Sequence, residues 1–164
     1  MISLVVLDID GCLSDGKIIY DANGLELKNF HVKDGFAIVH SYELGLEFAI
    51  ITGRNTPIVT NRAKELRIKH IFQGVKDKLA VLEELCVDLG VDLSEVAAIG
   101  DDLNDLKLLR SVGMSFAPLD AVKEVRSSVD VVLERNGGDA VVRDMIEMIL
   151  QKNGKYDEFV AKWL

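Results

Sequence analysis

Short apolar runs alternate along the chain with longer segments in which apolar residues recur at helical spacing. The runs are rich in Val, Ile and Leu, which is typical of strands buried on both faces of a parallel sheet. Six segments predict such strands: Leu4–Leu7, Phe48–Ile51, His70–Phe72, Val96–Ile99, Ser115–Ala117 and Val129–Leu133. The alternation therefore predicts an α/β fold built on a doubly wound, mostly parallel sheet.

The segments between these strands predict helices with recognisable ends. Asp34 is expected to cap the first helix, while Thr56 and Pro57 open the second, because Pro is tolerated at the first helical position. Gly45 and Gly90 follow the ends of the first and third helices, where glycine is favoured. The expected helices cover residues 34–44, 57–66, 78–89, 105–111, 121–127 and 140–150.

One segment interrupts this rhythm between the first strand and the first helix. Lys17–Tyr20 and Leu25–Phe30 flank an Asn-Gly pair, which strongly favours a β-hairpin. The hairpin carries Ile19, Leu25, Leu27 and Phe30 without an obvious partner in the chain. A lone two-stranded hairpin is marginal in water, so we expect it to rest on something, and another subunit would serve.

Composition and charge narrow the class of protein. The chain has 164 residues, 49% of them apolar and 28% charged, and no repeat or linker divides it, so we expect a single globular domain over 1–164. The net charge of −8 argues against a nucleic-acid binder or an anionic-membrane binder. No apolar run reaches the roughly 18 residues of a membrane span. The N-terminus lacks a basic region, and Cys12 and Cys86 form no framework, so a cytoplasmic location is expected.

Paired acids follow the first predicted strand. Asp8 and Asp10 are two residues apart, so on an extended chain they project to the same side at the strand's carboxyl end, where open α/β sheets bind ligands. Adjacent carboxylates repel, so the pair needs a cation or a shared proton. An Asx-rich turn that leaves the strand is the alternative interpretation.

A second acidic cluster follows the fourth predicted strand and contains Asp101, Asp102 and Asp105. If the first and fourth strands are neighbours, both clusters meet at one crevice. Carboxylate oxygens in this number suit Mg²⁺, whereas no His or Cys set supports zinc or copper. Helix capping by Asp is the alternative for this cluster taken alone.

Two further positions suit a phosphate group. Thr52, followed by Gly53 and Arg54, comes directly after the second strand, where a hydroxyl and backbone N–H groups can hold phosphate oxygens. Lys78 opens the third helix and can neutralise phosphate while it separates the acidic clusters. Each of these signals is weak alone, because Thr and Lys are common at helix starts.

In this order the motifs resemble those of the haloacid-dehalogenase-like phosphatase superfamily. The four motifs contain Asp8 and Asp10, then Thr52, then Lys78, and finally the Asp101 cluster. Too few residues separate the first two motifs for a cap domain, so the chain looks like the capless type. The stretches DGCLSDG, ITGR and GDDLND resemble the branch that acts on 3-deoxy-D-manno-octulosonate 8-phosphate, in lipopolysaccharide biosynthesis. That branch carries a third glycine in its tail, where this chain has Ala140.

The resemblance implies a mechanism and a magnesium cofactor. Asp8 would be the nucleophile that forms an aspartyl-phosphate, and Asp10 would serve as general acid and then as general base. Mg²⁺ would be bound by the carboxylates of Asp8 and Asp101 and by the backbone carbonyl of Asp10. Thr52 and Lys78 would hold the transferring phosphoryl oxygens.

The resemblance also implies roles around this centre. Asp102 and Asp105 would orient metal-bound water or Lys78. Arg54 would bind the carboxylate of an acidic sugar phosphate, because a guanidinium fork matches that group, although a surface arginine at a helix start is the plain alternative. A homotetramer assembled through the 17–30 hairpin is implied as well.

Other functions remain open from the sequence. A nonulosonate 9-phosphate is the second candidate substrate within the same chemistry. A phosphorylated receiver-type signalling domain also combines a doubly wound sheet with acids, Thr and Lys, but its phosphoacceptor follows the third strand, where this chain has no suitable acid. A non-catalytic assembly module on the same fold is a further alternative.

Overall fold

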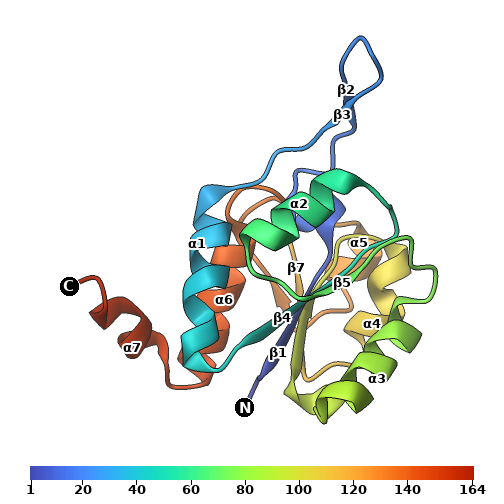
Figure 1. Ribbon diagram of the computed structural model, residues 1–164. Helices are drawn as coiled ribbons and strands as arrows, with labels where there is room; N and C mark the ends of the chain where they lie inside the picture. Colours follow the sequence, from blue (N-terminus) through green and yellow to red (C-terminus); the bar gives the residue numbers. More distant parts are fainter.

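The computed structural model describes residues 1–164 and contains one six-stranded sheet in the order β5-β4-β1-β6-β7-β8 (Figure 1). All neighbouring strands in it are parallel. The strands are β1 (Leu4–Leu7), β4 (Glu47–Ile51), β5 (His70–Phe72), β6 (Val96–Ile99), β7 (Met114–Ala117) and β8 (Val131–Val132). The predicted doubly wound α/β fold is confirmed, although β8 is shorter than the segment predicted for it.

The two faces of the sheet bury two separate cores. Val5 and Leu7 of β1 pack on one face, while Leu4 and Val6 pack on the other, as the two-residue period of a strand requires. The first core joins the sheet to α1 (Val32–Ser41), α2 (Pro57–Glu65) and α6 (Val141–Lys152). The second joins it to α3 (Lys78–Leu89), α4 (Leu106–Leu109) and α5 (Lys123–Arg126). Figure 1 shows α1 beside α6 on one side and α3 with α4 on the other.

The first helix begins earlier than the sequence predicted. His31, and not Asp34, is its N-cap, and the His31 Nδ1 accepts a hydrogen bond from the backbone N–H of Lys33. Asp34 lies inside the first turn, fully buried, and its carboxylate accepts the backbone N–H of Arg143 near the start of α6. The prediction for Asp34 was wrong because its side chain serves the N-terminus of a different helix.

The next two helices have the predicted ends. The Thr56 hydroxyl accepts from the N–H of Ile58 with Pro57 at the first helical position, and Asp77 caps α3. Gly90 ends α3 with a φ of 66°. Arg67 follows the end of α2 with a φ of 61°, although it is not a glycine.

Three short 3₁₀ turns accompany the helices and strands. The 3₁₀ turn Tyr42–Leu44 continues α1, Leu93–Glu95 precedes β6, and Leu103–Asp105 leads into α4. The helices α4 and α5 are each four residues long and lie within the predicted ranges. A C-terminal helix, α7 (Tyr156–Ala161), was not predicted; Phe159 is its one buried residue.

The predicted hairpin is present as β2 (Ile19–Tyr20) and β3 (Glu26–Leu27), and it projects from the body above the carboxyl ends of the strands (Figure 1). Its exposed large apolar residues are Ile18, Tyr20, Leu25 and Leu27. Phe30 differs from the expectation, because it packs against the first core and under the guanidinium of Arg62, 5.6 Å from the ring centroid.

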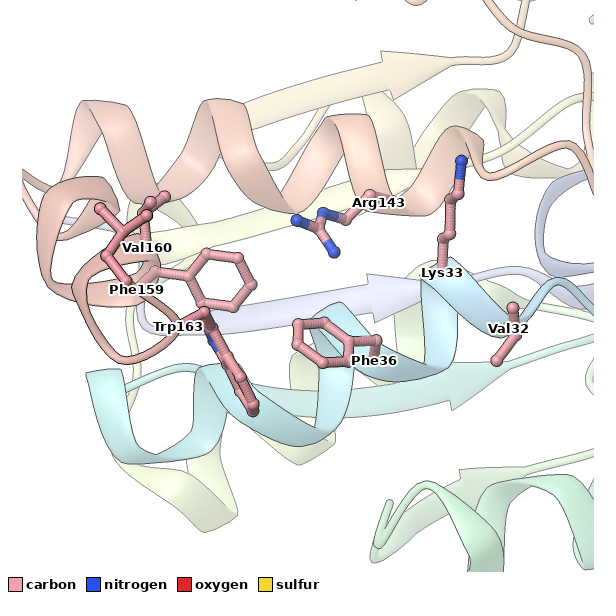
Figure 2. A pocket seen from close by; sticks show the side chains of 8 residues that line it. Val32, Lys33, Phe36, Arg143, Phe159, Val160 and Trp163 are labelled. Carbon is pink, nitrogen blue, oxygen red and sulfur yellow. The ribbon is translucent and has the colours of Figure 1, made fainter.

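An apolar pocket of about 470 Å³ lies between α1, α6 and α7. Figure 2 shows Phe36 of α1 facing Phe159 and Trp163, with Arg143 of α6 above them. The Arg143 guanidinium lies 5.4 Å from the Phe36 ring centroid and 5.2 Å from that of Phe159. This pocket shares no residue with the acidic clusters. None of the helices is both long enough and apolar enough to cross a membrane.

Candidate active site

The chain leaves β1 through a turn that places Asp8 and Asp10 at the carboxyl edge of the sheet. Asp8 still has extended backbone geometry, and Ile9–Leu13 then wind into a single wide turn. Gly11 has a φ of 90°, and a Cβ on it would lie 2.0 Å from a carboxylate oxygen of Asp101. Only glycine fits here, so the backbone of the first motif closely approaches the acidic cluster that follows β6.

One polar pocket of about 250 Å³ lies at the carboxyl ends of β1, β4 and β6. Its nine lining residues are all polar or glycine: Asp8, Asp10, Gly16, Thr52, Gly53, Arg54, Asp101, Asp102 and Asn104. β1 pairs with β6, so the first and fourth predicted strands are neighbours and the two acidic clusters meet, as expected for that arrangement. Of the predicted site residues, only Lys78 and Asp105 do not line this pocket.

Lys78 lies directly behind the pocket wall and is 3% exposed. Its Nζ is 2.8 Å from a carboxylate oxygen of Asp8 and 2.6 Å from one of Asp105. Burial alone would lower the pKa of Lys78, but the two carboxylates outweigh it and raise that pKa above its usual value. The ammonium group is therefore a fixed positive charge beside Asp8.

Asp8 and Asp101 are buried beside other carboxylates, which disfavours the ionised forms of both. Burial is the main cause that raises the pKa of Asp8 to about 6 and that of Asp101 to about 8. Neighbouring carboxylates raise both pKa values further, and Lys78 opposes them. Carboxylate oxygens of Asp8 and Asp101 lie within 4.8 Å of each other, so a hard divalent cation such as Mg²⁺ fits this donor set.

Asp102 and Asp105 hold the second acidic cluster in shape. The Asp102 carboxylate accepts the N–H of Leu103, while one oxygen of Asp105 accepts the N–H groups of Asp101 and Asp102. The other Asp105 oxygen contacts Lys78. Asp105 thus connects Lys78 to the loop that presents Asp101, and Asp102 lies at the pocket rim as a helix cap.

Thr52 and Cys12 complete the inner surface. Thr52 is buried at the end of β4, where its backbone N–H donates to Phe72. The Cys12 sulfur lies within 4.8 Å of carboxylate oxygens of Asp8 and Asp101. Burial, and then the nearby carboxylates, raise the pKa of this thiol well above its usual value. Cys12 and Cys86 are both unpaired and buried.

Two charged residues at this site were missed by sequence reasoning. Lys28, on the base of the hairpin, places its Nζ 2.5 Å from Asp10 and 3.2 Å from Glu26. The same Glu26 oxygen lies 2.8 Å from the guanidinium of Arg54. Glu26 and Lys28 are two residues apart on an extended segment, so they face the same side; that spacing was the only available signal.

The parallel sheet, with Asp8, Thr52, Lys78 and Asp101 at its carboxyl edge in this chain order, defines a haloacid dehalogenase-like hydrolase. That family matches residues 68–145. The chain is 40% identical over 158 residues to the 3-deoxy-D-manno-octulosonate 8-phosphate phosphatase of Haemophilus influenzae, covering 96% of this chain and 88% of that protein. The Escherichia coli phosphatase of the same name is 40% identical over 96% of this chain and 84% of its own length.

Solved structures agree with these relatives. The phosphatase from Moraxella catarrhalis, in complex with a magnesium ion, a phosphate ion and a KDO molecule, superposes with a TM-score of 0.97 at 42% identity, covering 99% of this chain and 94% of that one. The cobalt-bound Haemophilus influenzae enzyme gives a TM-score of 0.91 at 40% identity, covering 96% and 92%. This chain belongs to the family of 3-deoxy-D-manno-octulosonate 8-phosphate phosphatases. It is a sugar-phosphate phosphatase and not a receiver domain or an assembly module.

Proposed function

We propose that this protein removes the phosphate group from 3-deoxy-D-manno-octulosonate 8-phosphate, a step in lipopolysaccharide biosynthesis, with Mg²⁺ as cofactor. The family supports the substrate, because the relatives that match almost the whole chain are named for it. One observation carries the chemistry: a buried Asp8 carboxylate, paired with Lys78, lies beside Asp101 in a polar pocket.

In this proposal Asp8 attacks phosphorus, and the bond between phosphorus and the sugar oxygen breaks as an aspartyl-phosphate forms. Asp10 gives its proton to the leaving oxygen. Asp10 then takes a proton from the water that hydrolyses the aspartyl-phosphate, which releases inorganic phosphate and restores both acids. Thr52 and Lys78 hold the phosphoryl oxygens in this proposal, which the Lys78 ammonium supports by lying 2.8 Å from Asp8.

The carboxylates of Asp8 and Asp101 and the backbone carbonyl of Asp10 would hold Mg²⁺. When bound, the ion supplies positive charge that offsets the repulsion between carboxylate and phosphate. The raised pKa values of Asp8 and Asp101, caused first by burial and then by neighbouring carboxylates, support this assignment, since a bound cation would stabilise both groups in their ionised forms. Asp102 and Asp105 would not bind the ion themselves. They would hold in shape the loop that presents Asp101.

We also propose that Arg54 binds the sugar carboxylate. Its guanidinium lines the pocket and is 38% exposed, so a substrate can reach it. A bidentate contact with a carboxylate suits a guanidinium better than any other side chain. Glu26 already occupies one side of the fork, which leaves the remaining donors for the ligand.

Three organisational proposals accompany this function. The chain would act as one capless domain, since only the small hairpin separates β1 from α1. It would assemble as a homotetramer through the 17–30 hairpin, whose Ile18, Tyr20, Leu25 and Leu27 are exposed. A cytoplasmic location is supported by two unpaired thiols. Light scattering of the wild type and of a variant with Tyr20, Leu25 and Leu27 changed to Ser tests the assembly.

The substrate is tested with a phosphate-release screen. Purified protein with Mg²⁺ is assayed against 3-deoxy-D-manno-octulosonate 8-phosphate, a nonulosonate 9-phosphate and neutral hexose phosphates. We expect the highest kcat/KM for the octulosonate ester. A clear preference for the nonulosonate ester would overturn the substrate, while leaving the chemistry intact. Absence of turnover with every ester would overturn the function.

A further inference from the structure

Lys28 is a lysine with a buried side chain at the base of an exposed hairpin. The hairpin that carries it is exposed, with Leu25 and Leu27 at 65% and 48% exposure, yet the Lys28 side chain has no exposed surface. A buried lysine costs free energy unless carboxylates pair with it. Asp10 and Glu26 provide that pairing, at 2.5 Å and 3.2 Å.

The contact fixes one half of the Asp10 carboxylate. Lys28 donates to Oδ1 of Asp10, and the Asp10 side chain makes no other hydrogen bond. The second oxygen, Oδ2, is left without a protein partner beside the pocket that Asp10 lines. Oδ2 is therefore the oxygen of Asp10 that a ligand in the pocket can reach.

Glu26, also on the hairpin, holds Lys28 in place. Its Oε1 accepts from both Lys28 and Arg54, so one carboxylate oxygen ties the lysine to the far wall of the pocket. The Glu26 side chain is only 14% exposed. The chain of contacts Arg54–Glu26–Lys28–Asp10 joins the hairpin base to the pocket along a continuous polar path.

We propose that Lys28 is a positioning residue for the reaction: it holds Oδ1 of Asp10 so that Oδ2 faces the leaving oxygen of the substrate. The hairpin thereby belongs to the active site of its own subunit, independently of any role in assembly. This inference rests on the proposed function, in which Asp10 is the general acid.

The test compares two esters that differ in their need for an acid. A sugar phosphate leaves as an alkoxide and needs protonation, whereas p-nitrophenyl phosphate leaves as a stable phenolate. In Lys28→Met we expect kcat/KM for the sugar phosphate to fall roughly 10- to 100-fold, which is less than the full contribution of about 10²–10⁴-fold from general acid catalysis because Asp10 itself is still present. The kcat/KM for p-nitrophenyl phosphate, which reports only the steps up to phosphoryl transfer, should change less than about threefold.

Lys28→Arg keeps a donor and should recover most of the sugar-phosphate activity. Lys17→Met is the matched control, since Lys17 is an exposed lysine on the same hairpin with no ion pair, and it should leave both esters unchanged. Thermal unfolding of each variant reports whether the fold is retained.

A double-variant cycle decides whether Lys28 acts through Asp10. If it does, Lys28→Met combined with Asp10→Asn has the same kcat/KM for the sugar phosphate as Asp10→Asn alone, to within about twofold. Equal losses for both esters in Lys28→Met, or additive losses in the double variant, would overturn the proposal. If Asp10→Asn itself shows no selective loss for the sugar phosphate, the general-acid assignment in the proposed function fails instead.

Discussion

One carboxylate oxygen of Asp34 lies 2.7 Å from the backbone nitrogen of Arg143, joining the first turn of α1 to the first turn of α6. The helix α6 has no side-chain cap of its own, since Ala140 precedes it. Asp34 therefore serves as a cap supplied from another helix. Its second carboxylate oxygen is buried without a partner.

The buried carboxyl of Asp34 is expected to make the free energy of unfolding depend on pH. Burial is the main cause that raises the pKa of Asp34 to about 7, with Asp144 adding to it and the Arg143 N–H opposing it. Between the unfolded value of about 3.9 and this folded value, the native state holds a proton that the unfolded state has lost. The contribution of Asp34 to the free energy of unfolding therefore falls as pH rises from 4 to 7, by at most about 4 kcal/mol.

Asp34→Asn removes this titration while keeping an acceptor for the Arg143 N–H. Urea unfolding at pH 5 and at pH 7.5 should show the variant gaining stability relative to the wild type at the higher pH. The comparison cancels the titration of the acids at the active site, which both proteins share. Asp88→Asn, at an exposed position in α3, is the control and should show no such trend. A wild-type advantage that grows with pH would contradict this account of Asp34.

The buried Lys78 predicts a large loss of both stability and activity. In Lys78→Met the carboxylates of Asp8 and Asp105 lose their buried partner. Removing one member of a buried ion pair typically costs about 3–5 kcal/mol. We expect a loss of that size by urea unfolding at pH 7.5 without Mg²⁺, together with loss of turnover. Lys76→Met, two positions earlier and exposed, should change stability by less than about 0.5 kcal/mol.

Arg54 predicts a substrate-selective effect. Losing a charge-assisted contact costs about 1.5–3 kcal/mol, so Arg54→Ala should lower kcat/KM for the acidic ketose phosphate by roughly one to two orders of magnitude. A neutral sugar phosphate, which has no carboxylate, should be affected little. Steady-state kinetics with both esters measure the difference. Equal losses for the two would mean that Arg54 supports the phosphate group or, through Glu26, the hairpin.

The sheet could be predicted because its strands are buried on both faces. Leu4–Leu7 and Val96–Ile99 are uninterrupted apolar runs followed within two residues by acids, so strand and site were visible in the same few residues. The α7 helix lacks that signal, since a single buried residue, Phe159, anchors it. The α7 helix therefore could not be predicted from the sequence alone.

The same contrast applies to the site. The pocket residues stand at strand ends, where topology alone brings them together. Lys28 and Glu26 lie on a hairpin whose strands are two residues long, and charged residues there are typical of a solvated surface. Their contacts with Asp10 and Arg54 depend on how the hairpin base folds over the pocket. No local sequence pattern predicts how the hairpin base folds over the pocket.

One position offers a gain in stability. Arg67 follows the end of α2 with a φ of 61°, in the left-handed region that glycine adopts without strain, and its side chain is exposed. The adjacent N–H of Ile68 bonds back to Ala63, which closes the helix around this residue. Arg67→Gly should raise the free energy of unfolding by about 0.5–1 kcal/mol, whereas Arg67→Ala should not. A loss of stability in Arg67→Gly would show that its side chain contributes more than the strain costs.

Asp8 is the nucleophile in the proposed magnesium-dependent mechanism, and every other role at the site depends on this one. This role is tested most directly by the rate of phosphate release from 3-deoxy-D-manno-octulosonate 8-phosphate, at saturating Mg²⁺, for the wild type and for Asp8→Asn. The variant keeps the shape of the side chain and loses its nucleophilic oxygen, so we expect it to retain its fold and to lose turnover by on the order of 10³-fold or more. Release by Asp8→Asn within tenfold of the wild type, or full wild-type activity in excess chelator, would contradict the mechanism.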